Sequence, residues 1–125
     1  MKEIPAISDA EWEVMKVVWG KYPITAGEII SVMENQKDWK PKTIKTLIGR
    51  LVKKDVLGYE EKQRVYCYYP LISQEDCIQK ENKSFIKRVY NGAVKSMLVN
   101  FINDSELTEE DVRELQKLLQ EREEN

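Results

Sequence analysis

The spacing of the apolar residues changes at Leu57, and this change constrains the fold more than any other feature of the chain. Before Leu57, apolar residues recur three and four positions apart, as they do along one face of a helix. From Leu57 onward apolar and polar residues alternate, and the segment Val65–Tyr69, which Pro70 closes, is rich in residues that favour strands, above all tyrosine. The polar run Glu60–Arg64 lies in the middle, so the segment predicts a β-hairpin with a charged tip. Because the tip has no Asn-Gly pair, the type of turn is left open.

Five segments carry signals for the start of a helix. Four have a serine or threonine followed three residues later by an acid, the pattern of a reciprocal N-terminal cap. These pairs are Ser8 with Glu11, Thr25 with Glu28, Ser73 with Asp76, and Thr108 with Asp111. The fifth start is Pro41, which suits the first helical position because its missing N–H would be unpaired there. The order predicts a mainly α protein: an N-terminal winged helix–turn–helix of three helices and a hairpin wing, followed by a two-helix dimerisation segment.

Charge is distributed unevenly along the chain and supports a division near residue 72. Residues 1–72 hold 12 Lys or Arg against 10 Asp or Glu, whereas residues 73–125 hold 8 against 12. We therefore predict a winged-helix DNA-binding domain over residues 1–72 and a helical dimerisation domain over residues 73–125. The chain as a whole has a net charge of −2, so binding to nucleic acid must depend on where the charges lie.

The composition gives little support to catalysis. The 125 residues include no histidine, the commonest general base, and only two cysteines, Cys67 and Cys77, which are too few for a typical structural zinc site. We expect Cys67 to be packed among the tyrosines of a strand and Cys77 to be a small residue of a helix, and their number fits a reducing compartment. No segment reaches the ~18 apolar residues of a membrane span, and the N-terminus lacks the apolar run of a signal peptide. We predict a cytoplasmic protein that is not an enzyme and uses no metal or cofactor.

The stretch from Lys37 to Lys54 is the most basic part of the chain, with seven Lys or Arg residues and one acid. Its apolar residues share one side of the expected third helix, and the basic residues lie opposite with Gly49. A helix fits the major groove of DNA, where Lys and Arg neutralise phosphates and Thr meets a phosphate or a thymine methyl. The predicted DNA-contacting residues are Lys42, Thr43, Lys45, Thr46, Arg50 and Lys53, joined by Lys62 and Arg64 at the hairpin tip. The alternative is a solvated helix face that happens to be basic.

A long apolar stripe runs through the C-terminal part of the chain. Two helices are too few to form a stable core by themselves, so the stripe requires a covering surface. We favour a second copy of the chain, because a symmetric dimer buries the same patch on both partners and presents two recognition helices to a palindrome. The predicted dimerisation residues are Phe85, Ile86, Val89, Tyr90, Val94, Met97, Leu98, Phe101, Ile102, Leu115, Leu118 and Leu119. Packing onto the chain's own N-terminal domain is the alternative.

Four stretches of the chain together resemble the BlaI/MecI family of winged-helix repressors. They are the opening helix Ser8–Trp19, the basic stretch Lys37–Lys54, and the segments Lys83–Gly92 and Ser96–Phe101. The resemblance implies a homodimer that represses β-lactamase or penicillin-resistance genes from a palindromic operator on double-stranded DNA. It also implies inactivation after β-lactam sensing, when a membrane-bound sensor-transducer metalloprotease leads to cleavage of the dimerisation helix. The matching bond in this chain is Asn100–Phe101.

Two residues depart from the family pattern, and both lie at the expected DNA face. Lys40 occupies a position where a small capping residue is usual, and Gly49 one where threonine or a larger residue is common. These departures leave room for a different operator preference.

Two other functions are compatible with the same fold. One is a repressor of a different operon that responds to another signal. The copper-responsive relatives carry a C-terminal cysteine cluster, and this C-terminal part has only Cys77, which argues against that branch. The other is a winged-helix module that binds a protein instead of DNA, against which the basic stretch argues.

Overall fold

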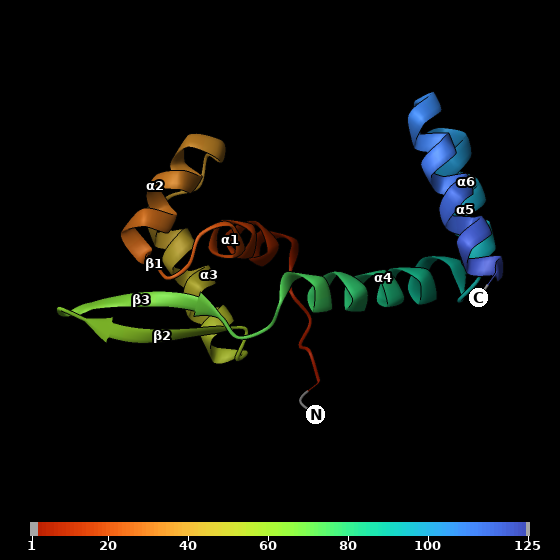
Figure 1. Cartoon of the computed structure of the whole chain (residues 1–125). Helices are drawn as coiled ribbons and strands as arrows, with labels where there is room; N and C mark the ends of the chain where they lie inside the picture. The colour runs from red at the N-terminus through yellow and green to blue at the C-terminus, as the bar shows by residue number, and fades with distance from the viewer. Residues whose placement is uncertain (1–2, 125) are drawn as a thin grey trace. The chain divides into compact units, whose positions relative to one another are not determined.

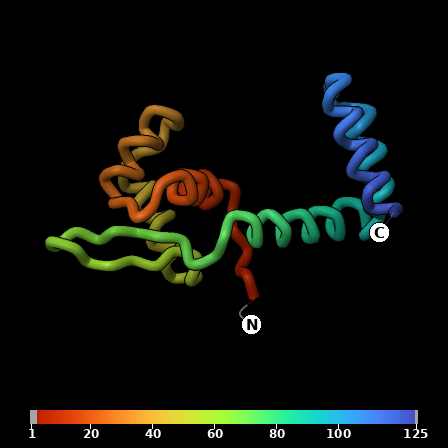
Figure 2. The backbone as a smooth tube through the Cα atoms, in the orientation of Figure 1, coloured from red at the N-terminus to blue at the C-terminus, as the bar shows by residue number. Residues whose placement is uncertain are grey.

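The computed structural model describes residues 3–124, which form two compact units that divide between Lys80 and Glu81. Both units are shown as ribbons in Figure 1 and as a continuous backbone tube in Figure 2. The elements are α1 (Asp9–Gly20), β1 (Ile24–Thr25), α2 (Ala26–Gln36), α3 (Pro41–Lys53), β2 (Leu57–Lys62), β3 (Val65–Pro70), α4 (Gln74–Tyr90), α5 (Val94–Asp104) and α6 (Glu109–Glu124). Within the described range, no helix is both long enough and apolar enough to cross a bilayer. The predicted mainly α fold, with three helices before a hairpin, is confirmed.

The predicted helix starts of the first unit are confirmed, and two of them have reciprocal caps. The Ser8 side chain accepts a hydrogen bond from the backbone N–H of Glu11, while the Glu11 carboxylate accepts one from the N–H of Ser8. Thr25 and Glu28 cap α2 in the same way. Such caps satisfy backbone donors that the first turn of a helix leaves unpaired. Helix α3 begins instead at Pro41, and its N-cap residue makes no side-chain hydrogen bond.

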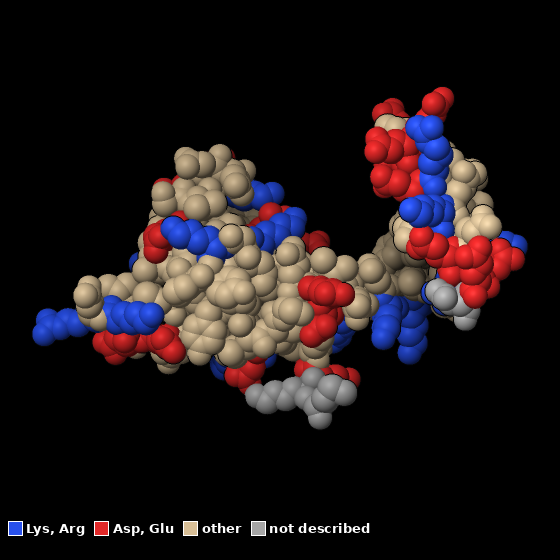
Figure 3. All heavy atoms as spheres, in the orientation of Figure 1, with Lys and Arg blue, Asp and Glu red and all other residues tan. Residues whose placement is uncertain are grey.

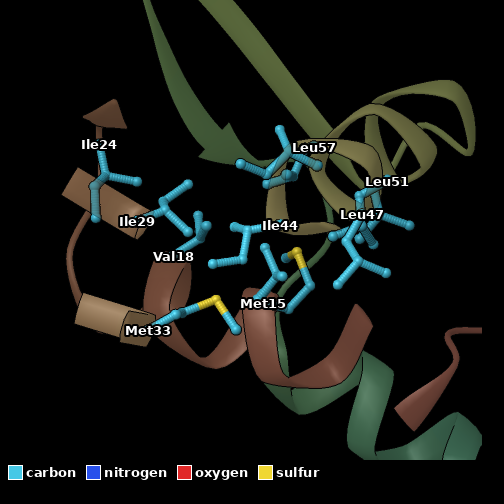
Figure 4. Packing of buried hydrophobic residues seen from close by; sticks show 12 residues of the cluster. Met15, Val18, Ile24, Ile29, Met33, Ile44, Leu47, Leu51 and Leu57 are labelled. Atoms are coloured by element: carbon cyan, nitrogen blue, oxygen red, sulfur yellow. The ribbon is translucent and has the colours of Figure 1, made fainter. Parts of the chain in front are cut away.

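The core of the first unit lies where α1, α2 and α3 converge under the base of the hairpin. Figure 4 shows Met15 and Val18 pointing toward side chains from the other two helices. The regularly spaced apolar residues of α1, α2 and α3 fill the space between these helices, as ridge-to-groove packing requires. The buried cluster is Val14, Met15, Val18, Ile24, Ile29, Met33, Ile44, Leu47, Ile48, Leu51, Val56 and Leu57.

The sheet is antiparallel and has the order β1-β3-β2. Strands β2 and β3 pair from Leu57 opposite Pro70 to Lys62 opposite Val65, which confirms the predicted hairpin. The connection has two residues, Gln63 with φ 54° and Arg64 with φ 66°. Positive φ at both central residues is what a type I′ turn requires, and this turn matches the twist of the paired strands.

Strand β1 adds a third strand that the sequence did not indicate. It pairs Ile24 with Tyr68 and Thr25 with Cys67. With only two residues it carries no readable alternation, although its second residue is the cap of α2. This short strand holds the start of α2 against the hairpin.

The second unit contains the end of α4 together with α5 and α6, so the prediction of two helices after the hairpin was wrong by one. The apolar stripe was read as a single helix through the region near Tyr90. The chain leaves the helical conformation there, because Asn91 has φ 51° and Gly92 has φ 86°. The N–H of Gly92 donates to the carbonyl of Ile86 at 3.0 Å and closes the end of α4. Left-handed Asn and Gly are the usual residues at such a helix end.

The compact units divide inside α4, whereas the predicted domains divide just before it, at residue 72. The start of α4 belongs with the first unit because Cys77 is buried there and Lys80 Nζ donates to the carbonyl of Ile4. The N–H of Asp76 donates to the Ser73 hydroxyl at 3.1 Å, as the predicted cap requires. The roles assigned to the two domains remain predictions.

Candidate nucleic-acid interface

Helix α3 presents two sharply different faces. Ile44, Leu47, Ile48 and Leu51 are buried against α1 and α2, and their spacing fixes the rotation of the helix about its axis. The opposite face is therefore turned to solvent by the packing of the core. An exposed helix held this firmly from behind can enter a groove as a rigid body.

Every residue of α3 that was predicted to contact DNA lies on the exposed side. Lys42, Thr43, Lys45, Thr46, Arg50 and Lys53 are all exposed. Among residues 3–124, the ion pairs within 4.0 Å involve none of the basic side chains in this set. The face is therefore a surface of uncompensated positive charge, which suits a polyanion.

Thr46 and Gly49 shape this face between the cations. The Thr46 hydroxyl donates to the carbonyl of Lys42 at 3.0 Å, one turn earlier, so its hydrogen is used within the helix while its oxygen can still accept. An atom added at the Cβ position of Gly49 would meet nothing within 4 Å. The space beside Gly49 is therefore open, and a ligand can come close to the helix backbone there.

The hairpin carries the two remaining predicted residues at its far end. Lys62 and Arg64 are both exposed, and blue spheres mark basic side chains at the hairpin tip in Figure 3. The Lys62 ammonium lies 4.0 Å from Glu60 on the same strand, a distance at which an exposed pair contributes little. Both cations remain available to a phosphate backbone beside the groove that α3 would occupy.

The hairpin is stiffened by tyrosines that the sequence analysis did not single out. Tyr59 contacts Tyr66 with ring centroids 4.7 Å apart and Tyr68 at 6.1 Å. On the other side, Tyr69 lies over Gly58, where an added Cβ would come within 2.8 Å of the ring. Burial, with the neighbouring tyrosines as a smaller cause, raises the pKa of Tyr68 above its ordinary value. The alternation of Tyr with small or polar residues was the signal that could have found this cluster.

Lys54 differs from the other cations of the basic stretch because it is paired with the buried carboxylate of Glu11. Its ammonium lies 2.6 Å from Glu11 Oε1 and also donates to the carbonyl of Ala6 at 3.0 Å. Burial raises the pKa of Glu11, but hydrogen bonds from Lys54 and Ser8 outweigh it, so the pKa stays below its usual value. The sequence analysis counted Lys54 with the basic stretch, and the structure shows that its charge is compensated.

The predicted dimerisation residues lie in the second unit and are largely uncovered within one chain. Helices α5 and α6 belong to this unit and contribute no buried residue. Phe85, Ile86, Tyr90 and Met97 are partly covered. The exposed members are Val89, Val94, Leu98, Phe101, Ile102, Leu115, Leu118 and Leu119, to which the structure adds Val99 and Val112.

The residues of the predicted cleavage site sit in the interior of α5. Asn100 is exposed and its Nδ2 donates to the Tyr90 hydroxyl at 3.3 Å, while Phe101 packs against Phe85 at a centroid distance of 6.1 Å. Among residues 3–124, no group of three or more His, Cys, Asp or Glu side chains is placed to hold a metal ion.

A three-helix core, a two-stranded wing and an exposed basic third helix define a winged-helix transcription regulator. The family model described as penicillinase repressor matches residues 7–121. The penicillinase repressor of Bacillus licheniformis is 43% identical over 121 residues, which are 97% of this chain and 94% of that protein. The methicillin resistance regulatory protein MecI of Staphylococcus aureus (strain N315) is 41% identical over 113 residues, 90% of this chain and 92% of the other. This chain belongs to the penicillinase repressor family, a family of transcriptional repressors and not of enzymes.

Solved structures support the same assignment for the first unit. The DNA-binding domain of the repressor BlaI superposes with a TM-score of 0.55 and 46% identity, covering 61% of this chain and 93% of that one. Monomeric BlaI of Bacillus licheniformis, solved in complex with the blaP half-operator, gives a TM-score of 0.54 at the same identity and coverage.

Proposed function

We propose that this protein is a homodimeric repressor that binds a palindromic operator of β-lactamase or penicillin-resistance genes. The observation that carries the proposal is the exposed basic face of α3, whose cations have no carboxylate partner among the described residues. The names of the relatives and the half-operator complex of BlaI support the same reading. Helix α3 reads base edges in the major groove, and the wing cations Lys62 and Arg64 contact phosphates.

The uncovered apolar surface of the second unit supports the homodimer. Helix α5 exposes 44% of Leu98 and 46% of Phe101, and α6 exposes 60% of Leu118 and 64% of Leu119. Large apolar side chains left exposed in this number point to an interface. A second copy buries it symmetrically, and two linked recognition helices then bind two half-sites with a much higher effective concentration.

Cleavage of the chain within this apolar surface would inactivate the repressor. Cleavage of the Asn100–Phe101 bond by a membrane-bound sensor-transducer metalloprotease, after β-lactam sensing, separates Leu98 from Phe101 and Ile102. The apolar side chains that would pack against a partner then belong to two fragments. The loss of the dimer removes the coupling between half-sites, and the operator is released at concentrations where the intact protein occupies it.

Fluorescence anisotropy across a salt series tests the DNA-binding part. Labelled palindromic operator, a single half-site and scrambled DNA are titrated with the full chain, with Arg50→Ala, and with the matched control Lys117→Ala on α6. We expect a preference for the palindrome of roughly 10³-fold or more, and a loss of about 1–3 kcal/mol for Arg50→Ala alone. Equal and weak binding of palindrome and scrambled DNA would instead favour a winged-helix module for another partner.

Sedimentation and induction test the other two parts. Sedimentation equilibrium that shows only monomer at micromolar concentration would reject the homodimer. In cells exposed to a β-lactam, the intact chain should give a fragment that ends at Asn100. An operon whose expression follows another signal would make this chain a repressor of the same fold with a different inducer.

A further inference from the structure

Four side chains of α4 and α5 form a closed set of contacts around the Asn100–Phe101 bond. The Phe85 ring packs edge-on against Tyr90, with centroids 5.8 Å apart, and stacks on Phe101 at 6.1 Å. The circle closes where Asn100 Nδ2 donates to the Tyr90 hydroxyl at 3.3 Å. Both residues that flank the bond therefore contact side chains of α4.

Helix α5 has few other sources of stability. It has only 11 residues, its N-cap residue Ala93 makes no side-chain hydrogen bond, and it buries no side chain. Its first turn has no acid and its last turn no basic residue, so its dipole is uncompensated at both ends. Helices shorter than about 12–15 residues are marginal in water unless tertiary contacts hold them. The contacts of the four side chains thus carry much of what keeps α5 folded within one chain.

We propose that Phe85, Tyr90, Asn100 and Phe101 act as a lock that sets how often the Asn100–Phe101 bond is accessible to a protease. The inference rests on the proposed cleavage of that bond and names its regulation. A protease needs its substrate extended, so α5 must unwind locally before it is cut. Unwinding at this point breaks the Tyr90–Asn100 hydrogen bond and the Phe85–Phe101 stack together, and both flanking side chains become free at the same moment.

The hydrolysis itself needs only the bond and water. Water adds to the carbonyl carbon of Asn100, the C–N bond to Phe101 breaks, and the products are a new carboxylate on Asn100 and a new amine on Phe101. The lock takes no part in this chemistry. It changes only the fraction of molecules in which the bond is exposed, so Tyr90 and Phe85 are positioning residues.

Tyr90→Phe is the sharpest test because it removes one oxygen and keeps the ring. Tyr59→Phe on β2 is the matched control, an exposed tyrosine outside the second unit. Two readouts are measured on the full chain: amide hydrogen exchange along α5, and the rate at which thermolysin, which cuts before bulky apolar residues, cleaves the Asn100–Phe101 bond. Loss of one neutral hydrogen bond should raise both rates roughly 3- to 10-fold, and Tyr59→Phe should change neither.

A concentration series separates the lock from protection by a partner copy. The lock closes within one chain, so the ratio of the Tyr90→Phe rate to the wild-type rate should persist on dilution, whereas protection by a dimer falls. Exchange and cleavage rates equal to wild type in Tyr90→Phe would overturn the lock. If the lock effect is present but induced cells never cut the Asn100–Phe101 bond, the lock stands and the proposed route of inactivation fails.

Discussion

The substitutions Lys53→Ala and Lys54→Ala each remove one positive charge from the same end of α3. One should change DNA binding and the other should change the stability of the fold. Lys53 is exposed, with no ion pair among the residues described, and points toward the proposed DNA side. The Lys54 ammonium is bound to Glu11 and to the carbonyl of Ala6. We expect Lys53→Ala to weaken DNA binding and Lys54→Ala to weaken folding.

The cost of Lys54→Ala follows from what remains around Glu11. The Glu11 side chain is 2% exposed, and without Lys54 its carboxylate keeps only the hydrogen bond from the N–H of Ser8. Among the residues described, its Oε2 atom already lacks a hydrogen-bond partner. Breaking a fully buried pair costs about 3–5 kcal/mol and an exposed pair about 0–1 kcal/mol. Because the Lys54 side chain is 35% exposed, we place the loss of unfolding free energy between these limits, at about 2 kcal/mol.

The loss should also depend on pH. In the folded wild-type protein the pKa of Glu11 is lowered, so its contribution is present above the ordinary value near 4.5 and is lost as the pH falls through the folded-state pKa. Without Lys54, burial acts against fewer hydrogen bonds and the folded-state pKa rises. The difference in unfolding free energy between wild type and Lys54→Ala should therefore shrink as the pH falls below about 4.5 and through the folded-state pKa of Glu11 in wild type.

Urea unfolding at several pH values and anisotropy on operator DNA across a salt series measure both effects. Lys53→Ala should reduce the slope of log affinity against log salt by about 0.9, the value for one phosphate contact, and leave the urea midpoint nearly unchanged. Lys54→Ala should lower the urea midpoint and leave the salt slope unchanged at temperatures where the protein is folded. A reduced slope in Lys54→Ala, with unchanged stability, would show that its charge reaches DNA and refute the reasoning.

Three further substitutions test other parts of the structure. Gly58→Ala should lower the unfolding free energy by roughly 1–2 kcal/mol, measured by urea unfolding, because the new Cβ would lie 2.8 Å from the Tyr69 ring, which has to move. Gln63→Asn should raise the unfolding free energy by about 0.5 kcal/mol in the same assay, since Asn tolerates the positive φ of the turn better than Gln; a lower midpoint would contradict the turn geometry. Leu118→Glu should shift the protein toward monomer in sedimentation equilibrium, because Leu118 is 60% exposed within one chain and is assigned to the dimer interface.

Local signals in the sequence were enough to place most of the first unit. The caps at Ser8 and Thr25 and the proline at the start of α3 involve residues close together in the chain, and each was read correctly. The face of α3 that meets solvent also followed from the spacing of Ile44 and its apolar neighbours, because a helix has only one rotation that buries them.

The features that were missed depend on distant residues or on very short elements. Glu11 and Lys54 are 43 positions apart, and nothing in either segment indicates that they meet. Strand β1 has two residues, too few to show a period. The break at Asn91 and Gly92 did have a local signal, an Asn-Gly pair, but the apolar stripe continues on both sides and was read as a single helix. The spacing of the apolar residues shows that the stripe needs a covering surface. It does not show whether that surface comes from a second copy of the chain.

The open space at Gly49 makes this position free to vary without any change in the packed core. An atom added there meets nothing within 4 Å, so a side chain can be introduced on the proposed DNA-facing surface without disturbing the packed side of α3. Alanine at this position should even favour the helix by about 1 kcal/mol relative to glycine. A lineage of such repressors can therefore test new side chains against new operators at this one position while the packed core is left undisturbed.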